Sequence, residues 1–357
     1  MKPKDQRDQI IYKNPYGYAA WPDIKILQNG DWVIAFCEAM ARPYLVHRDP
    51  SFLNMLIRST DQGQTWDQFP QVVGGYENYG MDDPGLVQLA NGDLLYNTFR
   101  FRYVSRDTAD RLGQYSDWIH HEIYPWAYKH EDTVVLRSID SGHTWCSSVV
   151  VDVRPFHAGC TLRPILELTD GTLLLPCYDE IQKPCPSFVV RSVDKGASWS
   201  GATAIAHDDV LQFYEPALVQ SRSGKLIAML RTHAEGGYYL YQCDSHDVGR
   251  TWTPPVRTPM YGLPAHLLAL RDGRVLCVYG RRFAPFGIRA CLSADEGQTW
   301  DIDNELVLRD EFPNGDLGYP TSAQLADGSV ITAYYGQDTD GVTCIQASTY
   351  SLPDSRA

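Results

Sequence analysis

The eight residues 293–300 read Ser293-Ala294-Asp295-Glu296-Gly297-Gln298-Thr299-Trp300, and the pattern Ser-x-Asp-x-Gly-x-Thr-Trp recurs along the chain. Further copies begin at Ser59, Ser138 and Ser245, and a fifth begins at Ser192 with Ser198 in place of the threonine. Ser and Asp side chains accept hydrogen bonds from nearby backbone N–H groups, glycine adopts a positive φ, and tryptophan packs between sheets. The pattern therefore predicts five similar tight turns in a β-sheet protein.

A second repeat consists of a strand, a turn centred on glycine and another strand. Its turn glycines are Gly30, Gly92, Gly171, Gly224, Gly273 and Gly328. Asn-Gly and Asp-Gly between apolar runs are strong hairpin signals. Six such hairpins predict an all-β fold, a six-bladed β-propeller that forms a single domain over residues 1–357. The sixth blade lacks the eight-residue pattern, and we expect residues 9–12 to supply its last strand.

The interval between Gly92 and Gly171 is the longest of the series, which predicts an insertion in the second blade at about residues 101–131. The insertion is rich in aromatic and histidine residues: Tyr115, Trp118, His120, His121, Tyr124 and Trp126. We expect it either to lean over the central site or to cover a blade edge or an oligomer contact.

Composition excludes several classes of partner. The 357 residues carry a formal net charge of −13, which works against nucleic acids and anionic membranes. No signal-peptide pattern and no apolar stretch of the ~18 residues that span a bilayer is present, so a cytoplasmic location is expected. The nine cysteines lie mostly in apolar runs and predict free thiols. No motif has zinc or calcium spacing, so neither metal nor cofactor is expected; the oligomeric state stays open.

The glycine repeat also predicts which residues meet at the centre, because the inner strands of a propeller converge on one axis. Nine residues before the turn glycines stand Trp21, Asp83, Leu162, Glu215, Pro264 and Tyr319, with Arg163 one residue later in the third blade. At the outgoing end of the hairpins come Glu38, Arg100, Asp179, Arg231, Arg281 and Arg282. Such groups at an axial pocket suit acid–base and nucleophilic chemistry, and the alternative is an ion-pair ring that only rigidifies the axis.

The repeated turns, known as Asp boxes, and the axial ring together resemble the sialidase (neuraminidase) superfamily over nearly the whole chain. The resemblance implies a retaining glycosidase in which a tyrosine attacks the sugar, a glutamate activates it, an aspartate is the acid/base and three arginines hold the substrate carboxylate. On this resemblance we expect Tyr319 to be the nucleophile, Glu215 its partner and Arg231 a clamp arginine.

The other site residues follow from the same resemblance. Asp49, in the loop 42–49, is the expected acid/base, and His47 is the alternative. A further clamp arginine is expected at Arg282, with Arg281 or Arg289 as substitutes. Asp83 is expected to contact the substrate.

One departure concerns the substrate. The family's first-blade Arg-Ile-Pro appears here as Ala20-Trp21-Pro22, so the first clamp arginine is missing unless Arg42, Arg163 or Arg100 compensates. We therefore expect an exo-glycosidase for an anionic sugar, which could be a sialic, related ulosonic or uronic acid. The alternatives are a carbohydrate-binding propeller without turnover and a polysaccharide lyase in which Tyr319 is a general base.

Overall fold

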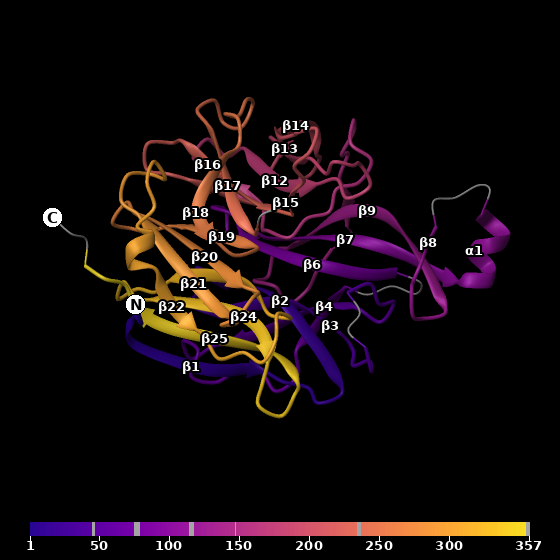
Figure 1. The fold of residues 1–357 in the computed structure, drawn as a ribbon, viewed down its shortest axis with the longest axis horizontal. Helices are drawn as coiled ribbons and strands as arrows, with labels where there is room; N and C mark the ends of the chain where they lie inside the picture. Colours follow the sequence, from indigo (N-terminus) through magenta and orange to yellow (C-terminus); the bar gives the residue numbers. More distant parts are fainter. Residues whose placement is uncertain (45–46, 75–78, 114–117, 147, 234–236, 355–357) are drawn as a thin grey trace.

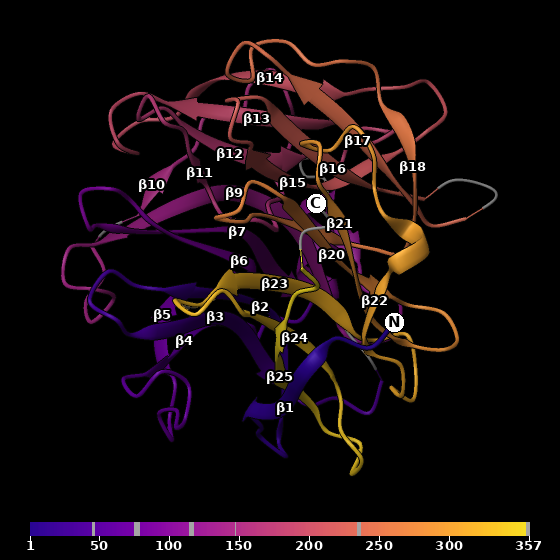
Figure 2. The ribbon, with the colours of Figure 1, turned by 90° about the vertical axis from the view of Figure 1, so that its left-hand side faces the viewer.

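The computed structural model describes residues 1–44, 47–74, 79–113, 118–146, 148–233 and 237–354. Over this part of the chain the backbone forms six antiparallel sheets arranged around one axis (Figures 1 and 2). The helical segments described are the α-helix α1 (Arg106–Leu112) and the 3₁₀ turn η2 (Ile302–Asn304). The predicted six-bladed propeller is confirmed.

The sheets follow one another along the chain, and each contributes its first strand to the axis. The first blade contains β2 (Gly17–Ile26), β3 (Trp32–Met40), β4 (Leu53–Ser59) and β5 (Gln71–Gly74). The second contains β6 (Tyr79–Gln88), β7 (Leu94–Ser105), β9 (Trp126–Ser138) and β10 (Val149–Val150), with β8 (Ile119–His120) paired to β9. The third contains β11 (Leu166–Glu167), β12 (Leu173–Tyr178), β13 (Ser187–Ser192) and β14 (Ser200–Ala206).

The remaining blades have the same order. The fourth contains β15 (Phe213–Gln220), β16 (Leu226–Thr232), β17 (Tyr239–Ser245) and β18 (Val256–Tyr261). The fifth contains β19 (Ala265–Ala269), β20 (Val275–Arg281), β21 (Gly287–Ser293) and β22 (Leu306–Arg309). The sixth contains β23 (Gly318–Gln324), β24 (Val330–Gln337), β25 (Thr343–Ser351) and β1 (Lys4–Tyr12). The pairing of β1 with β25 closes the ring with the N-terminal segment, as expected, through a longer strand than residues 9–12.

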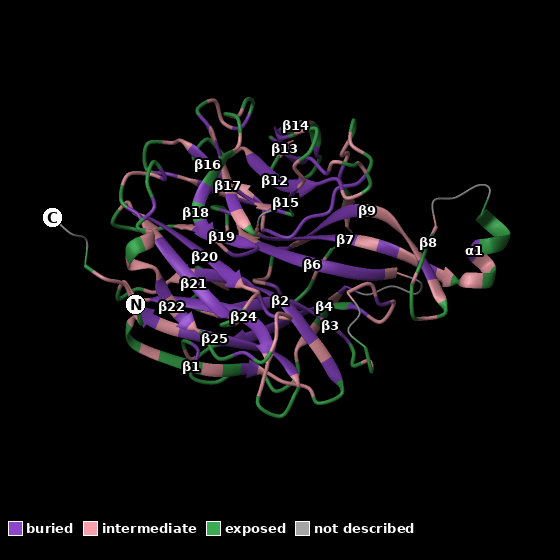
Figure 3. Ribbon diagram, in the orientation of Figure 1, coloured by how far each residue is buried: buried purple, intermediate pink, exposed green. Residues whose placement is uncertain are grey.

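Hydrophobic side chains hold neighbouring blades together. Seven buried clusters are described, and each joins residues of adjacent blades. Between the fourth and fifth blades, for example, Met229 packs in one cluster with Leu267 and Trp300. Figure 3 shows that the blade interiors are buried while loops, α1 and much of β1 are exposed. Because each buried large aliphatic side chain contributes about 1.5–3 kcal/mol, this packing fixes the blades relative to the axis.

The five repeated turns share one hydrogen-bond pattern. In the fifth blade Ser293 Oγ accepts from the Gly297 N–H at 2.7 Å and donates to Asp295 Oδ1 at 2.8 Å. Asp295 also accepts from the Thr299 backbone N–H at 2.8 Å and from its hydroxyl at 2.6 Å. The other four turns repeat these bonds within 0.2 Å. The repeated residues thus build one rigid turn between the third and fourth strands of each of the first five blades.

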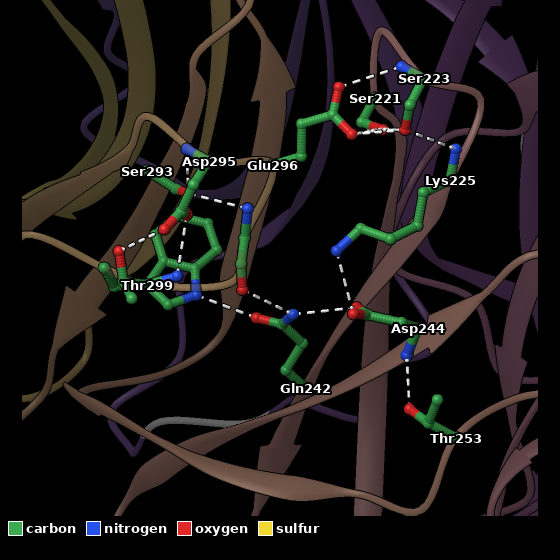
Figure 4. Close-up of polar contacts among 12 residues, drawn as sticks. Ser221, Ser223, Lys225, Gln242, Asp244, Thr253, Ser293, Asp295, Glu296 and Thr299 are labelled. Atoms are coloured by element: carbon green, nitrogen blue, oxygen red, sulfur yellow. Dashed lines mark hydrogen bonds and ion pairs between the residues drawn. The ribbon is translucent and has the colours of Figure 1, made fainter.

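The turns also join neighbouring blades. Figure 4 shows the fifth-blade turn against the fourth blade. Glu296 accepts from the Ser223 N–H and the Ser221 hydroxyl, each at 3.0 Å. The indole N–H of Trp300 donates to Gln242 at 2.9 Å. Ser221 and Ser223 lie in the turn between β15 and β16, and Gln242 lies on β17, so the turn of the fifth blade contacts the fourth blade at two places.

The insertion is a long hairpin. Strands β7 and β9 extend beyond the blade and pair as far as Ser105 and Trp126, and α1 follows β7 at the tip (Figure 1). The hydroxyl of Ser105 caps α1 by accepting from the Thr108 N–H. Residues 114–117 of the insertion lie outside the described residues. Among the described helices, none is long and apolar enough to cross a bilayer.

Candidate active site

Four ring residues share an unusual backbone conformation. Trp21, Asp83, Glu215 and Tyr319 have φ values of 55°, 43°, 49° and 48°, and a proline follows each of them. Each lies in a β-bulge, where the pairing of the inner strand with the second strand shifts register. A bulge re-aims a side chain, and a non-glycine residue at positive φ stores about 1–3 kcal/mol of strain. The strain is held at the same place in four blades and directs four side chains towards the axis.

These four side chains line one cavity of about 1180 Å³, larger than a typical small-ligand pocket. The described residues from other elements that line it include Arg231 at the end of β16, His47 from the first blade and Glu180 from the third. The base of the inserted hairpin forms one wall through Phe101, Ile119, Tyr128, Lys129 and His130. The insertion therefore does border the central site, one of the two roles expected of it.

Tyr319, Glu215 and Arg231 form a hydrogen-bonded triad in this cavity. The Tyr319 hydroxyl donates to Glu215 Oε1 at 2.8 Å. Arg231 Nη1 donates to both Glu215 oxygens, at 2.7 and 2.8 Å, and to the Tyr319 oxygen at 2.9 Å. The structure thus brings together the expected nucleophile, its partner and one clamp arginine.

The triad separates the protonation states of its members. Burial and the Glu215 carboxylate raise the pKa of Tyr319 above its usual value, so the phenol is protonated. Burial alone would raise the pKa of Glu215, but Arg231 outweighs it and the net pKa is lowered. Glu215 is therefore an ionised base that accepts a hydrogen bond from the phenol it would deprotonate.

The pKa of Asp83 is shifted in the opposite direction to that of Glu215. Burial, Asp82 and Glu215 raise its pKa well above the usual value. Its Oδ1 is buried and has no hydrogen-bond partner among the described residues. A carboxyl group with a raised pKa in the same cavity as one with a lowered pKa is the arrangement that supplies an acid and a base at one site.

Asp49, the expected proton donor, is held elsewhere. Its carboxylate pairs side-on with Arg42 at 2.7 and 3.1 Å and accepts from Ser51 N–H and Oγ. Burial alone would raise its pKa, but these partners lower it below the usual value. Neither Asp49 nor Arg42 is among the described residues that line the cavity. A buried ion pair with a lowered pKa anchors the loop and does not fit a proton donor at neutral pH.

His47, the alternative, does line the cavity. Its ring packs edge-on against Trp21 with centroids 5.7 Å apart, and Nε2 lies 3.5 Å from Asp316 Oδ1. Trp21 itself stands where the resemblance would place the first clamp arginine.

Most of the predicted arginines do not reach the cavity. Arg282 lies beside the triad, with its guanidinium carbon 5.8 Å from the Tyr319 ring centroid, and donates to the Gly315 carbonyl. Arg281 donates to the Ala284 carbonyl, Arg100 pairs with Asp132, Arg289 pairs with Glu305, and Arg163 lies beneath the ring. Of the arginines expected to bind substrate, Arg231 is the one that lines the described cavity.

Several cavity residues were missed from the sequence. Arg48 pairs with Asp82 at 2.8 Å and with Glu180 at 3.0 Å. His233 accepts from Arg231 Nε at 2.9 Å, and burial together with Arg231 lowers its pKa to about 4. His233 follows Arg231 by two residues, so strand alternation could have indicated it. Arg48 and Glu180 lie in loops, where no strand alternation indicates the direction in which a side chain points.

The cavity is cationic although the chain is acidic. Its described lining holds four cationic side chains, Arg48, Lys129, Lys183 and Arg231, and three carboxyl groups, Asp83, Glu180 and Glu215. The four positive charges exceed the negative ones even when all three carboxyl groups are ionised. The described residues contain no group of three His, Cys, Asp or Glu side chains that could hold a metal ion.

Comparison with known proteins agrees with the fold. Residues 116–332 match the model of the BNR repeat-like domain. A protein of unknown function from Dyadobacter fermentans is 26% identical, with a TM-score of 0.88 over 98% of this chain and 100% of its own. No curated protein matches the sequence.

Two enzymes share the fold at lower identity. The NanB sialidase of Streptococcus pneumoniae (K499G mutant) is 12% identical, with a TM-score of 0.71 over 96% of this chain and 70% of its own. The α-L-arabinanase of Penicillium chrysogenum, complexed with arabinobiose, is 15% identical, with a TM-score of 0.68 over 96% and 97%. The chain belongs to the BNR repeat-like family and has the six-bladed propeller fold of the sialidases.

Proposed function

We propose that the protein is a retaining exo-glycoside hydrolase that acts on an anionic sugar. The observation that carries the proposal is the Tyr319–Glu215–Arg231 triad on the wall of a large axial cavity. A phenol that donates to an ionised carboxylate is an activated nucleophile, and a glycosidase needs one facing its substrate.

In the first step Glu215 takes the Tyr319 proton while the phenolic oxygen bonds to the anomeric carbon. The glycosidic bond breaks, and Asp83 gives its proton to the departing oxygen. In the second step the Asp83 carboxylate takes a proton from water, whose oxygen displaces Tyr319, and Glu215 returns the phenolic proton. We assign the proton to Asp83 in place of Asp49 because Asp83 lines the cavity and has a raised pKa.

The charge of the cavity supports an anionic substrate. Arg231 and Lys183 are cationic groups of the described lining, and Lys183 is exposed. A positive cavity in a chain of charge −13 attracts an anionic sugar and disfavours a polyphosphate or nucleic-acid strand, which would meet the acidic outer surface. Because the arabinanase shares the fold, a neutral arabinoside is the substrate against which the proposed anionic sugar should be compared.

A panel of chromogenic glycosides tests the proposal. It should include sialic, other ulosonic and uronic acids beside α-L-arabinofuranosides, with product analysis on natural oligosaccharides. We expect release of a reducing anionic sugar with retained anomeric configuration. An unsaturated product would indicate a lyase, hydrolysis of arabinosides alone would refute the anionic substrate, and binding without turnover would indicate a lectin.

A further inference from the structure

A second cavity lies at the other end of the propeller axis. It has a volume of about 630 Å³, and all six blades line it, with Lys25, Gln88, Arg163, Gln220, His266 and Gln324 as one residue from each. Gln220 follows Glu215 by five residues on β15, which is about 16 Å along a strand. This mouth therefore opens on the face opposite the active site.

Arg163, which lines this cavity, has a buried guanidinium with unused hydrogen-bond donors. The residue is 2% exposed, and its Nη1 donates to the Pro320 carbonyl at 3.0 Å. Nε and Nη2 are buried and have no hydrogen-bond partner among the described residues. A buried charged group with unpaired donors is costly, so these nitrogens call for a ligand.

The unpaired nitrogens form the edge of the guanidinium that binds oxyanions. In this protein the Nε and Nη2 atoms of Arg42 hold Asp49 at 2.7 and 3.1 Å. The same two atoms of Arg154 hold Asp152 at 2.8 and 2.6 Å. Two parallel N–H donors match the two oxygens of a carboxylate or phosphate group. The free edge of Arg163 thus has the geometry of a side-on oxyanion site.

The carboxyl groups near Arg163 are either paired with other cationic side chains or have a raised pKa. Asp23 accepts from Lys25 Nζ and from the Leu86 N–H, each at 2.6 Å. Glu215 is paired with Arg231. Burial, Asp82 and Glu215 raise the pKa of Asp83, which disfavours its charged form. Arg163 therefore forms no ion pair within 4.0 Å among the described residues, and burial lowers its pKa to about 10 although the charge of Asp23 acts against this shift.

His266 adds a second unused group to the same cavity. It is 6% exposed, and its Nδ1 is buried without a hydrogen-bond partner among the described residues. Burial and the nearby charges of Arg163 and Lys25 lower its pKa well below the usual value, so the ring is neutral. A neutral imidazole can donate one hydrogen bond from Nδ1 to an anion.

We propose that the cavity opposite the active site binds a small oxyanion, a carboxylate or a phosphate, on the Nε–Nη2 edge of Arg163, with His266 as a second contact. This proposal does not rest on the proposed hydrolase activity. A phosphate group and a carboxylate can both accept the two parallel N–H donors of Arg163, and titration with inorganic phosphate and with acetate distinguishes them.

Calorimetric titration of the purified protein with inorganic phosphate and with acetate, at constant ionic strength set by chloride, measures the site. We expect saturable binding of at least one probe, and a rise in melting temperature with its concentration. Arg163→Lys keeps the charge but removes the two-donor edge, so the Kd should rise about tenfold or more. Arg154→Lys, which removes the same edge on the exposed surface, is the matched control and should leave the Kd unchanged.

Two further measurements test the anion site without relying on the folding of the Arg163→Lys variant. Tyr319→Phe should bind the anion as the native protein does, even if the proposed function fails. Crystals soaked in selenate, a phosphate-sized anomalous scatterer, should show a peak within hydrogen-bond distance of Arg163 Nε and Nη2. Water alone at this edge in soaked crystals, or equal Kd values for the native protein and Arg163→Lys, would overturn the proposal.

Discussion

The outer turns and the axial ring are both products of the same repeat, yet they differ in what the repeat keeps constant. In the five outer turns the side chains and their hydrogen bonds are nearly identical from blade to blade. In the ring the backbone bulge recurs in four blades, but the side chain is Trp, Asp, Glu or Tyr. Repeated side chains therefore build the scaffold, and a repeated backbone with varied side chains builds the site.

The largest effect that separates the two regions is expected at Tyr319. Tyr319→Phe removes the attacking oxygen and leaves the ring packed, so kcat should fall at least ~10³-fold. The melting temperature should change little, because the phenol OH is one hydrogen-bond donor beside an ion pair that stays intact. Steady-state kinetics and calorimetry on the same preparation measure both. Near-normal turnover would remove Tyr319 from the mechanism.

The next effect concerns the proton donor. Asp83→Asn should lower kcat/KM about 10²-fold or more on substrates with poor leaving groups and spare those with good ones. The raised pKa of Asp83 also predicts that kcat/KM falls on the alkaline side as this acid ionises, and that Asp83→Asn loses this limb. Leaving-group series and pH profiles measure both signatures. If Asp49→Asn shows them and Asp83→Asn does not, the assignment of the donor is reversed.

A substitution in an outer turn should lower the stability and leave kcat unchanged, the reverse of the effect expected at Tyr319. Asp295→Ala removes the acceptor for the Thr299 N–H and hydroxyl, which should cost about 1–3 kcal/mol of unfolding free energy. The kcat of the folded protein should stay unchanged, since the turn lies away from the axis. Thr299→Ser, the residue found at this position in the third blade, is the matched control and should be nearly neutral. Denaturant unfolding and kinetics compare the two variants, and a large loss of kcat in folded Asp295→Ala would contradict the division of roles.

The smallest expected effect is a difference in how the stability contributions of the outer-turn aspartates and of Asp83 depend on pH. The pKa values of Asp61 and Asp194 are lowered to about 2, chiefly by hydrogen bonds from Thr65 and Ser198, so these turns stabilise the fold above the unfolded pKa. This contribution is lost as the pH falls towards 2. Asp83 has a raised pKa, so its contribution is full at acid pH and lost as the pH rises. Asp83→Asn should therefore raise the denaturant midpoint at neutral pH, whereas Asp61→Asn should lower it; equal shifts would refute the contrast.

The sequence predicted the fold because its signals are local and repeated. The Ser, Asp and Gly of each turn bond to one another within five residues, so spacing alone indicates the structure. The glycine register also predicted that Asp83, Glu215 and Tyr319 share a cavity, because a fixed offset along the inner strand fixes height on the axis.

The site was predicted less completely where loops contribute. Asp49 was the expected proton donor, but its orientation depends on an ion pair with Arg42 that no strand period indicates. Arg48, the preceding residue, faces the cavity and pairs with Asp82 and Glu180 from other blades. The positive φ of the ring residues was also not predicted, since a residue before proline is normally extended.

The most direct test of the central claim is to trap the reaction on the ring. A substrate that carries a fluorine beside the anomeric carbon and a good leaving group should slow both steps and let a covalent intermediate accumulate. Peptide mapping by mass spectrometry should then find the sugar attached to Tyr319, and no adduct should form in Tyr319→Phe. A sugar attached to Glu215 or Asp83, or turnover to an inverted product without any adduct, would contradict the account.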